Sequence, residues 1–354
     1  MSYVQNVRTL RDNERWEAEI KAEITADALV HFRSLALKEL TKTAQIKGFR
    51  AGHAPESEIV RAAGEQEILR RAAELAVRET LPELLASEKL NVVDTPSVSI
   101  ETPKAGSPLP FTARAPLAPE ITLPDYKKIA HEKNISHTPV AVSDKEYDET
   151  VTYLRRERAR VEKIDAGSDP KQAAEEAQTM SEKDLPALDD TFVKTLGAEN
   201  LEEFSEKMRA QLLHEKEMQE KNKARASLLD ALAAAAKISY PTILQEYELD
   251  DMEARLVEDL GRIGHTLESY LVETKKNRDA LRAEWKEAAD KRVKIRLILA
   301  EIGRKENKDA PIEAVERELE HAKKHYPEAR PEALRAHITH ALRNEAVLLF
   351  LESL

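Results

Sequence analysis

The sequence predicts a multidomain, mainly α-helical protein that begins with an α+β domain. Its 354 residues exceed what one compact helical domain usually holds. Charged residues make up 34% of the chain and aromatic residues 5%, with nine glycines, which favours long helices with solvated faces over a sheet-rich enzyme. Alternating patterns typical of strands are found before residue 118, and helical periodicity dominates after it.

Composition also restricts the classes of function. A net charge of −11 disfavours nonspecific binding of nucleic acid by the whole surface, so any RNA contact needs a local basic patch. The absence of cysteine excludes a disulfide framework and thiolate chemistry. The N-terminus lacks the apolar core of a signal peptide, and the apolar runs at 231–236 and 346–351 are far shorter than the ~20 residues that span a bilayer. We therefore expect a soluble, cytoplasmic protein.

The first elements are two strands and a helix. Residues 3–24 predict two strands joined by a turn at Asp12 and Asn13, because apolar and charged residues alternate in the second half of this stretch. Thr25 or Asp27 can cap the helix that follows. Its apolar residues recur at helical spacing, which indicates one buried face.

Two more helices and two strands complete the predicted α+β domain, which ends near residue 117. A short helix is expected from Pro55 to about Ala63, with Gly64 ending it. A longer helix begins at Glu65, and Pro82 is expected to kink or restart it. Two short strands are expected at residues 97–101 and 111–117.

The remaining chain predicts a linker and then helices. Prolines punctuate residues 118–140, which favours an extended linker. Ser143 and Glu146 have the spacing of a capping box and begin a helix. After residues 185–194 the pattern is helical throughout. Helices are expected to begin near Asn200, Tyr240-Pro241, Asp279, Pro311 and Pro331.

The connector between the first two helices is the most informative stretch. Gly48 and Gly52 allow backbone conformations that other residues resist, and Pro55 suits the first position of a helix. Phe49 and Arg50 lie side by side on this polar connector. Aromatic residues and arginine are enriched in binding hot spots, so the pair predicts a partner contact. The structural alternative is that Phe49 folds back onto its own helices.

The pattern Gly-Phe-Arg-x-Gly-x-x-Pro, formed by Gly48, Phe49, Arg50, Gly52 and Pro55, resembles the ribosome-docking signature of trigger factor. Trigger factor is the bacterial chaperone that meets nascent chains at the tunnel exit. The segments 119–126 and 185–197 are also similar to that family. The resemblance implies an ATP-independent chaperone with elongated helical arms, whose partners are ribosomal protein and rRNA of the large subunit and nascent or unfolded polypeptides. It also allows a homodimer through the docking domain.

One departure from the family pattern bears on activity. Trigger factor usually has an FKBP-type prolyl isomerase domain after the docking domain. Only about twenty residues, 165–184, stand at that place, too few for a ligand-binding sheet of several strands of ~5–6 residues each. We therefore expect three parts: a docking domain at 1–117, a linker, arm helix and short segment at 118–186, and a helical client-binding domain at 187–354.

Other candidate sites predict no enzyme. His321 and His325, like His337 and His340, have spacings that can hold zinc, but we interpret them as polar helix faces. The basic run Arg155, Arg156, Arg158, Arg160 predicts a solvated helix face whose arginines pair with nearby acidic residues. RNA contact is the alternative. Sequence patterns indicate no catalytic residue, no metal and no cofactor. The prolyl isomerase activity of the family stays a competing hypothesis.

Two further expectations concern binding. Most apolar residues of the C-terminal helices should form helix–helix core, and a minority should be exposed for clients. Met208, Met218 and Met252 would suit an adaptable surface, although core packing is their ordinary role. Ala51 stands where many family members have lysine, and Glu56 and Glu58 are close by. A non-ribosomal holdase is therefore the alternative function, and a periplasmic chaperone with similar helical domains is a third.

Overall fold

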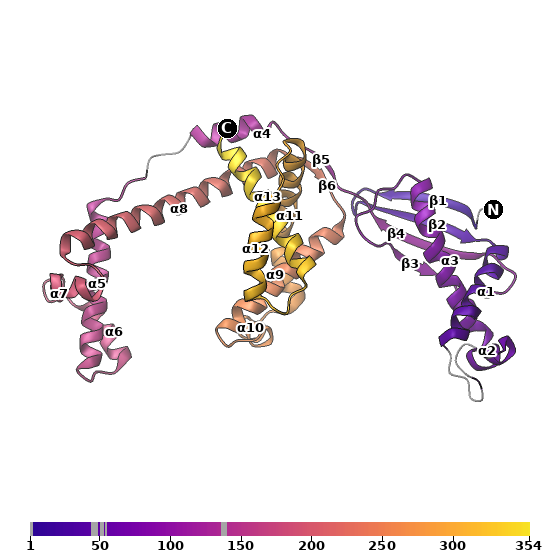
Figure 1. The fold of residues 1–354 in the computed structure, drawn as a ribbon, viewed down its shortest axis with the longest axis horizontal. Coiled ribbons are helices and arrows are strands. Elements are labelled where there is room, and N and C mark those ends of the chain that lie inside the picture. The colour runs from indigo at the N-terminus through magenta and orange to yellow at the C-terminus, as the bar shows by residue number, and fades with distance from the viewer. Residues whose placement is uncertain (1–2, 44–48, 50–52, 54, 136–139) are drawn as a thin grey trace. The chain divides into compact units, whose positions relative to one another are not determined.

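The computed structural model describes residues 3–43, 49, 53, 55–135 and 140–354. By its internal contacts the chain forms two compact units. One unit combines Met1–Pro124 with Ala235–Lys305, and the other combines Asp125–Ala234 with Glu306–Leu354. Strands and helices along the chain are labelled in Figure 1.

A four-stranded antiparallel sheet with the order β1-β2-β4-β3 organises the N-terminal part. Its middle strands alternate as predicted: in β2, every second residue from Ala18 to Ile24 is buried. Ile20 lies opposite Ala113 and Ile24 lies opposite Leu109, so the apolar residues of both strands share one face. The strands are β1 (Val4–Asp12), β2 (Glu17–Ile24), β3 (Ser97–Ile100) and β4 (Leu109–Pro116).

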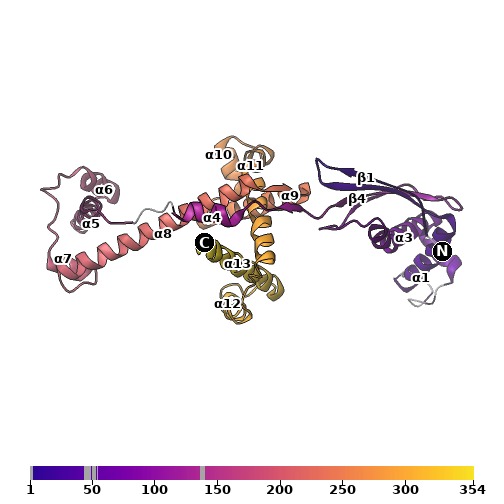
Figure 2. The ribbon, with the colours of Figure 1, turned by 90° about the horizontal axis from the view of Figure 1, so that it is seen from above.

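Three helices follow β2, and two of them cover the apolar face of the sheet. They are α1 (Ala26–Thr43), α2 (Glu56–Ala63) and α3 (Glu65–Ser87). Figure 2 shows α1 and α3 together on one side of the sheet. Phe32 of α1 and Ile68 of α3 are 1% and 0% exposed in this core. The Thr25 hydroxyl accepts from the Ala28 amide at 3.2 Å, which confirms Thr25 as a cap of α1.

Two helix boundaries in this part differ from prediction. Pro55 precedes α2 as its N-cap, with φ −62° and ψ 151°, instead of being its first helical residue. Helix α3 continues through Pro82, so of the two expectations there, a kink or a restart, the restart was wrong. Leu81, Leu84 and Leu85 on either side of the proline are all buried in the core, so packing outweighs the one backbone hydrogen bond that proline cannot donate.

The same unit contains a small two-stranded sheet and three helices. The helices and one of the two strands come from the second half of the chain. Strand β5 (Glu120–Thr122) pairs with β6 (Lys237–Ser239). After them come α9 (Thr242–Arg262), α10 (Leu267–Thr274) and α11 (Arg278–Lys305). Ion pairs join α9 to α11: the Arg282 guanidinium lies 2.9 Å from Glu246, 2.7 Å from Asp250 and 3.2 Å from Glu253.

The second unit is helical in its described residues. The long helix α8 begins after Asn200, whose side chain accepts from the Glu203 amide at 2.9 Å. The capping box of α5 is present, with Ser143 and Glu146 bonded in both directions. The helices are α4 (Tyr126–Ile135), α5 (Asp144–Asp165), α6 (Pro170–Thr179), α7 (Asp190–Thr195), α8 (Leu201–Ala235), α12 (Ile312–His325) and α13 (Pro331–Glu352).

The extended linker predicted for residues 118–140 was wrong over α4. Pro119 and Pro124 precede this helix, so they do not interrupt it. Tyr126 and Ala130, one turn apart, are 4% and 0% exposed. The Tyr126 hydroxyl donates to Glu306 at 2.6 Å, and α4 packs against α13. Tertiary contacts therefore make this stretch helical.

Short helices α6, α7 and α10 were not predicted. Each has a side-chain cap: Asp169 accepts from the amides of α6, Asp189 from Phe192 of α7, and Thr266 forms a capping box with Ser269 at α10. Across the described residues, no helix combines the length and apolar character needed to cross a membrane.

Candidate functional site

The connector between α1 and α2 contains the predicted partner contact. The Phe49 side chain is 43% exposed. His53 is exposed as well, and Pro55 leads into α2. Three of the predicted site residues, Gly48, Arg50 and Gly52, lie outside the described residues, as does Ala51. The described part of the connector thus presents an accessible aromatic ring between two helices.

Arg33 of α1 ties together the two helices that follow the connector. Its Nε lies 2.6 Å from Glu65 Oε1 and its Nη2 lies 2.8 Å from Glu65 Oε2, a bidentate pair with the first residue of α3. Its Nη1 lies 3.3 Å from Glu56 in the first turn of α2. Hydrogen bonding to Glu65 raises the pKa of Arg33, and the same pair lowers the pKa of the Glu65 carboxyl. Sequence patterns had not indicated this ion pair.

Gly64 makes the turn that allows this arrangement. It separates α2 from α3 with φ +83°, a conformation that residues with a Cβ rarely adopt. The Gly64 amide donates to the Val60 carbonyl at 2.9 Å, and α2 ends at this glycine, as predicted. Ile59 of α2 is 1% exposed, so the short helix is anchored on the domain core. The connector therefore spans two elements whose positions are set by packing and by Arg33.

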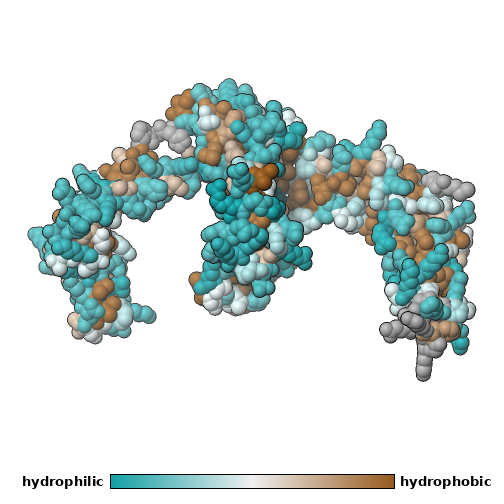
Figure 3. Space-filling model, viewed as in Figure 1, coloured by the Kyte–Doolittle hydropathy of each residue, from teal (hydrophilic) through white to brown (hydrophobic). Residues whose placement is uncertain are grey.

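The C-terminal helices expose a minority of their apolar residues, as expected. Leu201, Ile263, Ile312 and Leu349 are among the exposed ones, whereas Leu228, Leu232, Leu249 and Ile298 are buried. Met208 belongs to the core, whereas Met218 is exposed. On the face in view, Figure 3 shows brown residues in separate patches surrounded by teal. Such patches suit several weak apolar contacts better than one deep pocket.

In the first unit, exposed apolar residues lie near the short connection between α9 and α10. Val272 of α10 is 79% exposed and Ile263 at the end of α9 is 69% exposed. Helix α10 has no buried residue, and few contacts join it to α9. In the second unit, the most exposed apolar residues are Ile312, Ile135, Tyr153 and Tyr326.

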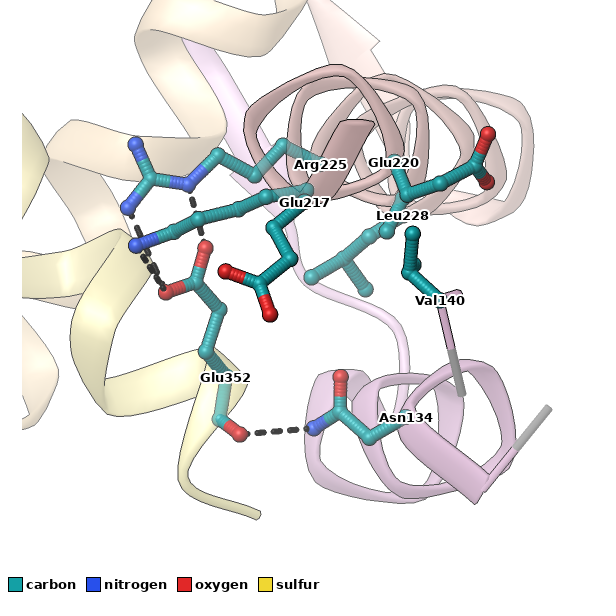
Figure 4. A pocket seen from close by; sticks show the side chains of 9 residues that line it. Asn134, Val140, Glu217, Glu220, Arg225, Leu228 and Glu352 are labelled. Atoms are coloured by element: carbon teal, nitrogen blue, oxygen red, sulfur yellow. Dashed lines mark hydrogen bonds and ion pairs between the residues drawn. The ribbon is translucent and has the colours of Figure 1, made fainter. Parts of the chain in front are cut away.

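A hollow of about 430 Å³ in the second unit is lined by residues of α4, α8 and α13, several of which form ion pairs. As Figure 4 shows, Arg225 of α8 reaches Glu352 of α13 at its rim. The same guanidinium lies 2.7 Å from Glu345, and the Asn134 amide donates to the Leu351 carbonyl at 2.9 Å. These charged groups bind one another, so they connect α8 to α13, and the Asn134 bond connects α4 to α13.

The arginines of the basic run on α5 have two roles. Some form ion pairs on the solvated face of the helix, and one binds the backbone of a distant segment. Arg158 pairs with Glu162 at 2.7 Å and Arg160 with Glu157 at 2.8 Å, as predicted. Arg155 differs, because its guanidinium donates to the carbonyls of Pro186 at 2.7 Å and Leu185 at 2.8 Å. Its acceptors are backbone atoms some thirty residues away, so no charge pattern in the sequence indicates them.

The segment at the usual place of the isomerase domain folds as helix α6 against α5. Ala177 of α6 and Leu185 pack with Ala159 of α5 in a small buried cluster. Lys163 of α5 pairs with Glu176 of α6 at 2.6 Å. Through these contacts the segment stabilises α5.

The histidine pairs lie on α12 and α13. The rings of His321 and His325 on α12 have centroids 4.7 Å apart. Throughout the part of the chain that the structure describes, no group of three or more His, Cys, Asp or Glu side chains is arranged to hold a metal ion.

Comparison with known proteins identifies the family. The model of the bacterial trigger factor protein (TF) matches residues 7–154, and the model of its C-terminus matches residues 200–348. Trigger factor of Caldicellulosiruptor bescii is 25% identical over 381 aligned residues, covering 88% of this chain and 86% of that protein. Trigger factor of Geobacillus sp. (strain WCH70) is 26% identical, covering 88% and 89%.

A solved structure described as "Promiscuous Substrate Recognition in Folding and Assembly Activities of the Trigger Factor Chaperone" shares the fold, with a TM-score of 0.53 at 16% identity. The alignment covers 98% of this chain and 99% of that one. The predicted fold class, an α+β domain followed by a long helical region, is confirmed. Together, the two family models and the relatives show that this chain belongs to the trigger factor family.

Proposed function

We propose that this chain is an ATP-independent cytoplasmic chaperone that docks on the large ribosomal subunit at the tunnel exit through Phe49 and Arg50. The observation that supports docking is the 43% exposed Phe49 on a connector whose flanking helices are fixed by the Arg33 ion pairs. Because the positions of the flanking helices are already fixed, binding does not have to order them, which lowers the entropy cost of docking. The neighbouring guanidinium would pair with rRNA phosphate or a ribosomal carboxylate.

The helical parts would then shield apolar nascent segments. We assign this role to the exposed residues of 187–354, the stretch that we propose as the client-binding domain. Burying an exposed aliphatic side chain gains about 25 cal/mol per Å², so one contact of roughly 100 Å² contributes about 2.5 kcal/mol before entropy costs. Several such contacts on separate patches would bind clients weakly and reversibly, with tolerance of sequence.

Catalysis of prolyl isomerisation is not part of the proposal. The stretch 165–184 contains helix α6, whose buried residues pack on α5. A rate of prolyl isomerisation in a peptide assay well above the uncatalysed rate would contradict this assignment.

Co-sedimentation with ribosomes tests docking. Wild-type protein should pellet with ribosomes, and the double variant Phe49→Ala, Arg50→Ala should lose most of that binding. Val30→Ala is the matched control, because Val30 is an exposed aliphatic residue on α1 of the same domain. If the wild type stays in the supernatant, or the double variant pellets equally well, the docking proposal fails.

A second function, a non-ribosomal holdase, is favoured by the charges near the connector. Ala51 lacks the positive charge that many family members have there, and Glu56 and Glu58 lie in the first turn of α2. This alternative predicts that the protein suppresses aggregation of an unfolded client while it fails to pellet with ribosomes. Both functions predict that Ile263→Ser with Val272→Ser weakens aggregation suppression, whereas Val7→Ser on the sheet does not.

A further inference from the structure

Strand β3 leaves one edge of the N-terminal sheet open. Its residues Ser97–Ile100 pair with β4 on one side and form the end of the strand order on the other. The Glu101 amide donates to Pro110 at 3.1 Å. Since hydrogen-bonded pairs alternate along an antiparallel ladder, Ser97 and Ser99 also bond toward β4. The backbone N–H and C=O groups of Val98 and Ile100 therefore point away from the sheet, with no partner among the described residues.

A hollow lies beside this open edge. Val98 and Ile100 lie opposite Ala113 and Phe111, so their side chains belong to the helix-covered face. Ala113 and Phe111 are 0% and 2% exposed, whereas Val98 is 39% exposed. Helix α3 thus covers the middle of the sheet and stops short of its edge. The resulting hollow of about 450 Å³ is lined by Gln66, Glu67, Arg70, Ala73, Glu74, Val98, Ile100, Glu101, Thr102 and Pro103.

Negative charge surrounds the apolar floor of the hollow. Three carboxylates, Glu67, Glu74 and Glu101, line it together with one guanidinium, Arg70. Glu67 binds Arg70 at 2.7 Å, and Glu74 binds it as well. Hydrogen bonding to Arg70 lowers the pKa of the Glu67 carboxyl to about 2, so it stays ionised at neutral pH. Glu67 also binds Arg71 at 3.2 Å, so Glu67 and Glu74 are both paired with arginine. Glu101 is therefore the carboxylate of the hollow that favours a ligand with a cation next to aliphatic groups.

We propose that this hollow binds an extended polypeptide segment, in which aliphatic residues alternate and lysine or arginine is close by, as an added antiparallel strand on β3. Strand addition uses the backbone groups of an open edge for affinity and pockets for alternate side chains for specificity. Residues opposite Val98 and Ile100 would place their side chains in the hollow and bond to these two residues. A cation on the segment would lie near Glu101.

The open edge is short, which limits the site to a brief segment. Pro96 precedes the strand and Pro103 follows it, and the Gln66 amide donates to the Pro103 carbonyl at 3.3 Å. Prolines beside a short edge also protect a sheet from uncontrolled pairing. Selective binding of one short strand is compatible with that protection. The inference depends on the proposed function only for the cellular source of the ligand, a client polypeptide, and it does not depend on ribosome docking.

Peptide binding to the full chain tests the site. The ligand is a fluorescein-labelled synthetic peptide in which valine and serine alternate between terminal lysines, measured by fluorescence anisotropy. Two derivatives carry N-methyl groups, one on the valine amides and one on the serine amides. In the proposed register the valine amides bond to the edge, so their methylation should weaken binding about tenfold or more, whereas methylation of the serine amides should change it by less than about twofold.

Variants of the protein give an independent readout. Ile100→Pro removes an outward N–H and keeps the bonds to β4, so it should also weaken binding about tenfold. Glu101→Gln should weaken binding about threefold and reduce its salt dependence, whereas Glu88→Gln, an exposed control at the end of α3, should not. Ribosome co-sedimentation of Ile100→Pro should equal that of the wild type, which separates this site from docking.

Three results would overturn the proposal: no binding of the unmethylated peptide, equal binding of the two methylated peptides, or wild-type affinity in Ile100→Pro. If Ile100→Pro instead converts a dimer to a monomer in size-exclusion chromatography while the peptide fails to bind, the edge pairs with a second copy of the chain. Should Ile100→Pro fail to fold, the methylated peptides still decide the matter with the unaltered protein.

Discussion

Replacing Arg33 with methionine should loosen the base of the connector that presents Phe49. The substitution keeps most of the aliphatic stem and removes the ion pairs with Glu65 and Glu56. Exposed ion pairs contribute about 0.2–1 kcal/mol, and the bidentate geometry puts this pair at the upper end. The Arg33 side chain is 28% exposed and that of Glu65 44%, so solvent screens the interaction and a loss of about 1 kcal/mol is expected.

Urea unfolding followed by the fluorescence of Trp16 measures this loss. The Trp16 indole donates to the Ala118 carbonyl at 2.9 Å, so it reports on the N-terminal sheet. Replacing Trp285 with phenylalanine in both proteins leaves Trp16 as the sole tryptophan. Arg61→Met is the matched control, because Arg61 is an exposed arginine in the last turn of α2.

The pH dependence of the stability loss distinguishes the contribution of the ion pair from that of side-chain packing. Arg33 lowers the pKa of the Glu65 carboxyl, so the pair stabilises the folded state above the unfolded-state pKa of about 4.3. This stabilisation is lost as the pH falls through the lower folded-state pKa. The difference between wild type and Arg33→Met should therefore shrink in acid. An unchanged urea midpoint at neutral pH, or an equal loss at pH values where Glu65 is protonated, would refute the reasoning.

Three further predictions concern stability. Phe32→Ala removes a ring that is 1% exposed in the N-terminal core and should cost about 3–5 kcal/mol in urea unfolding, with Val30→Ala as the exposed control. Arg282→Met breaks the ion pairs between α9 and α11 and should cost about 1–2 kcal/mol, a loss that shrinks as salt is added to a thermal unfolding assay. Tyr126→Phe removes the hydroxyl bond to Glu306 and should cost about 1 kcal/mol, measured as faster hydrogen exchange in α4.

Local patterns made much of the fold predictable. Alternation predicted β2, and capping residues marked the starts of α5 and α8 because a side-chain oxygen and an amide three positions on are neighbours in any helix start. Gly64 ended α2 for the same reason: its left-handed conformation is a local preference. The connector pattern that includes Phe49 and Pro55 is likewise contiguous in sequence, so one sequence sufficed to suggest the family.

Long-range contacts decided the remainder. Helix α4 was missed because its stability depends on the hydrogen bond between Tyr126 and Glu306. The hydrogen bond from Arg155 to the Pro186 carbonyl likewise joins two segments that no local pattern relates. Arg33, which braces the connector, was missed because its partners are 23 and 32 residues away. The edge at β3 is open because β3 is the last strand in the sheet order, and a strand's alternation does not specify which neighbour it lacks. The sequence by itself therefore determined the strands of the N-terminal sheet, the long helices and the connector pattern that suggested the family. Tertiary packing alone decided that residues 126–135 are helical, which side chains fix the helices around that connector, and which edge of the sheet stays open.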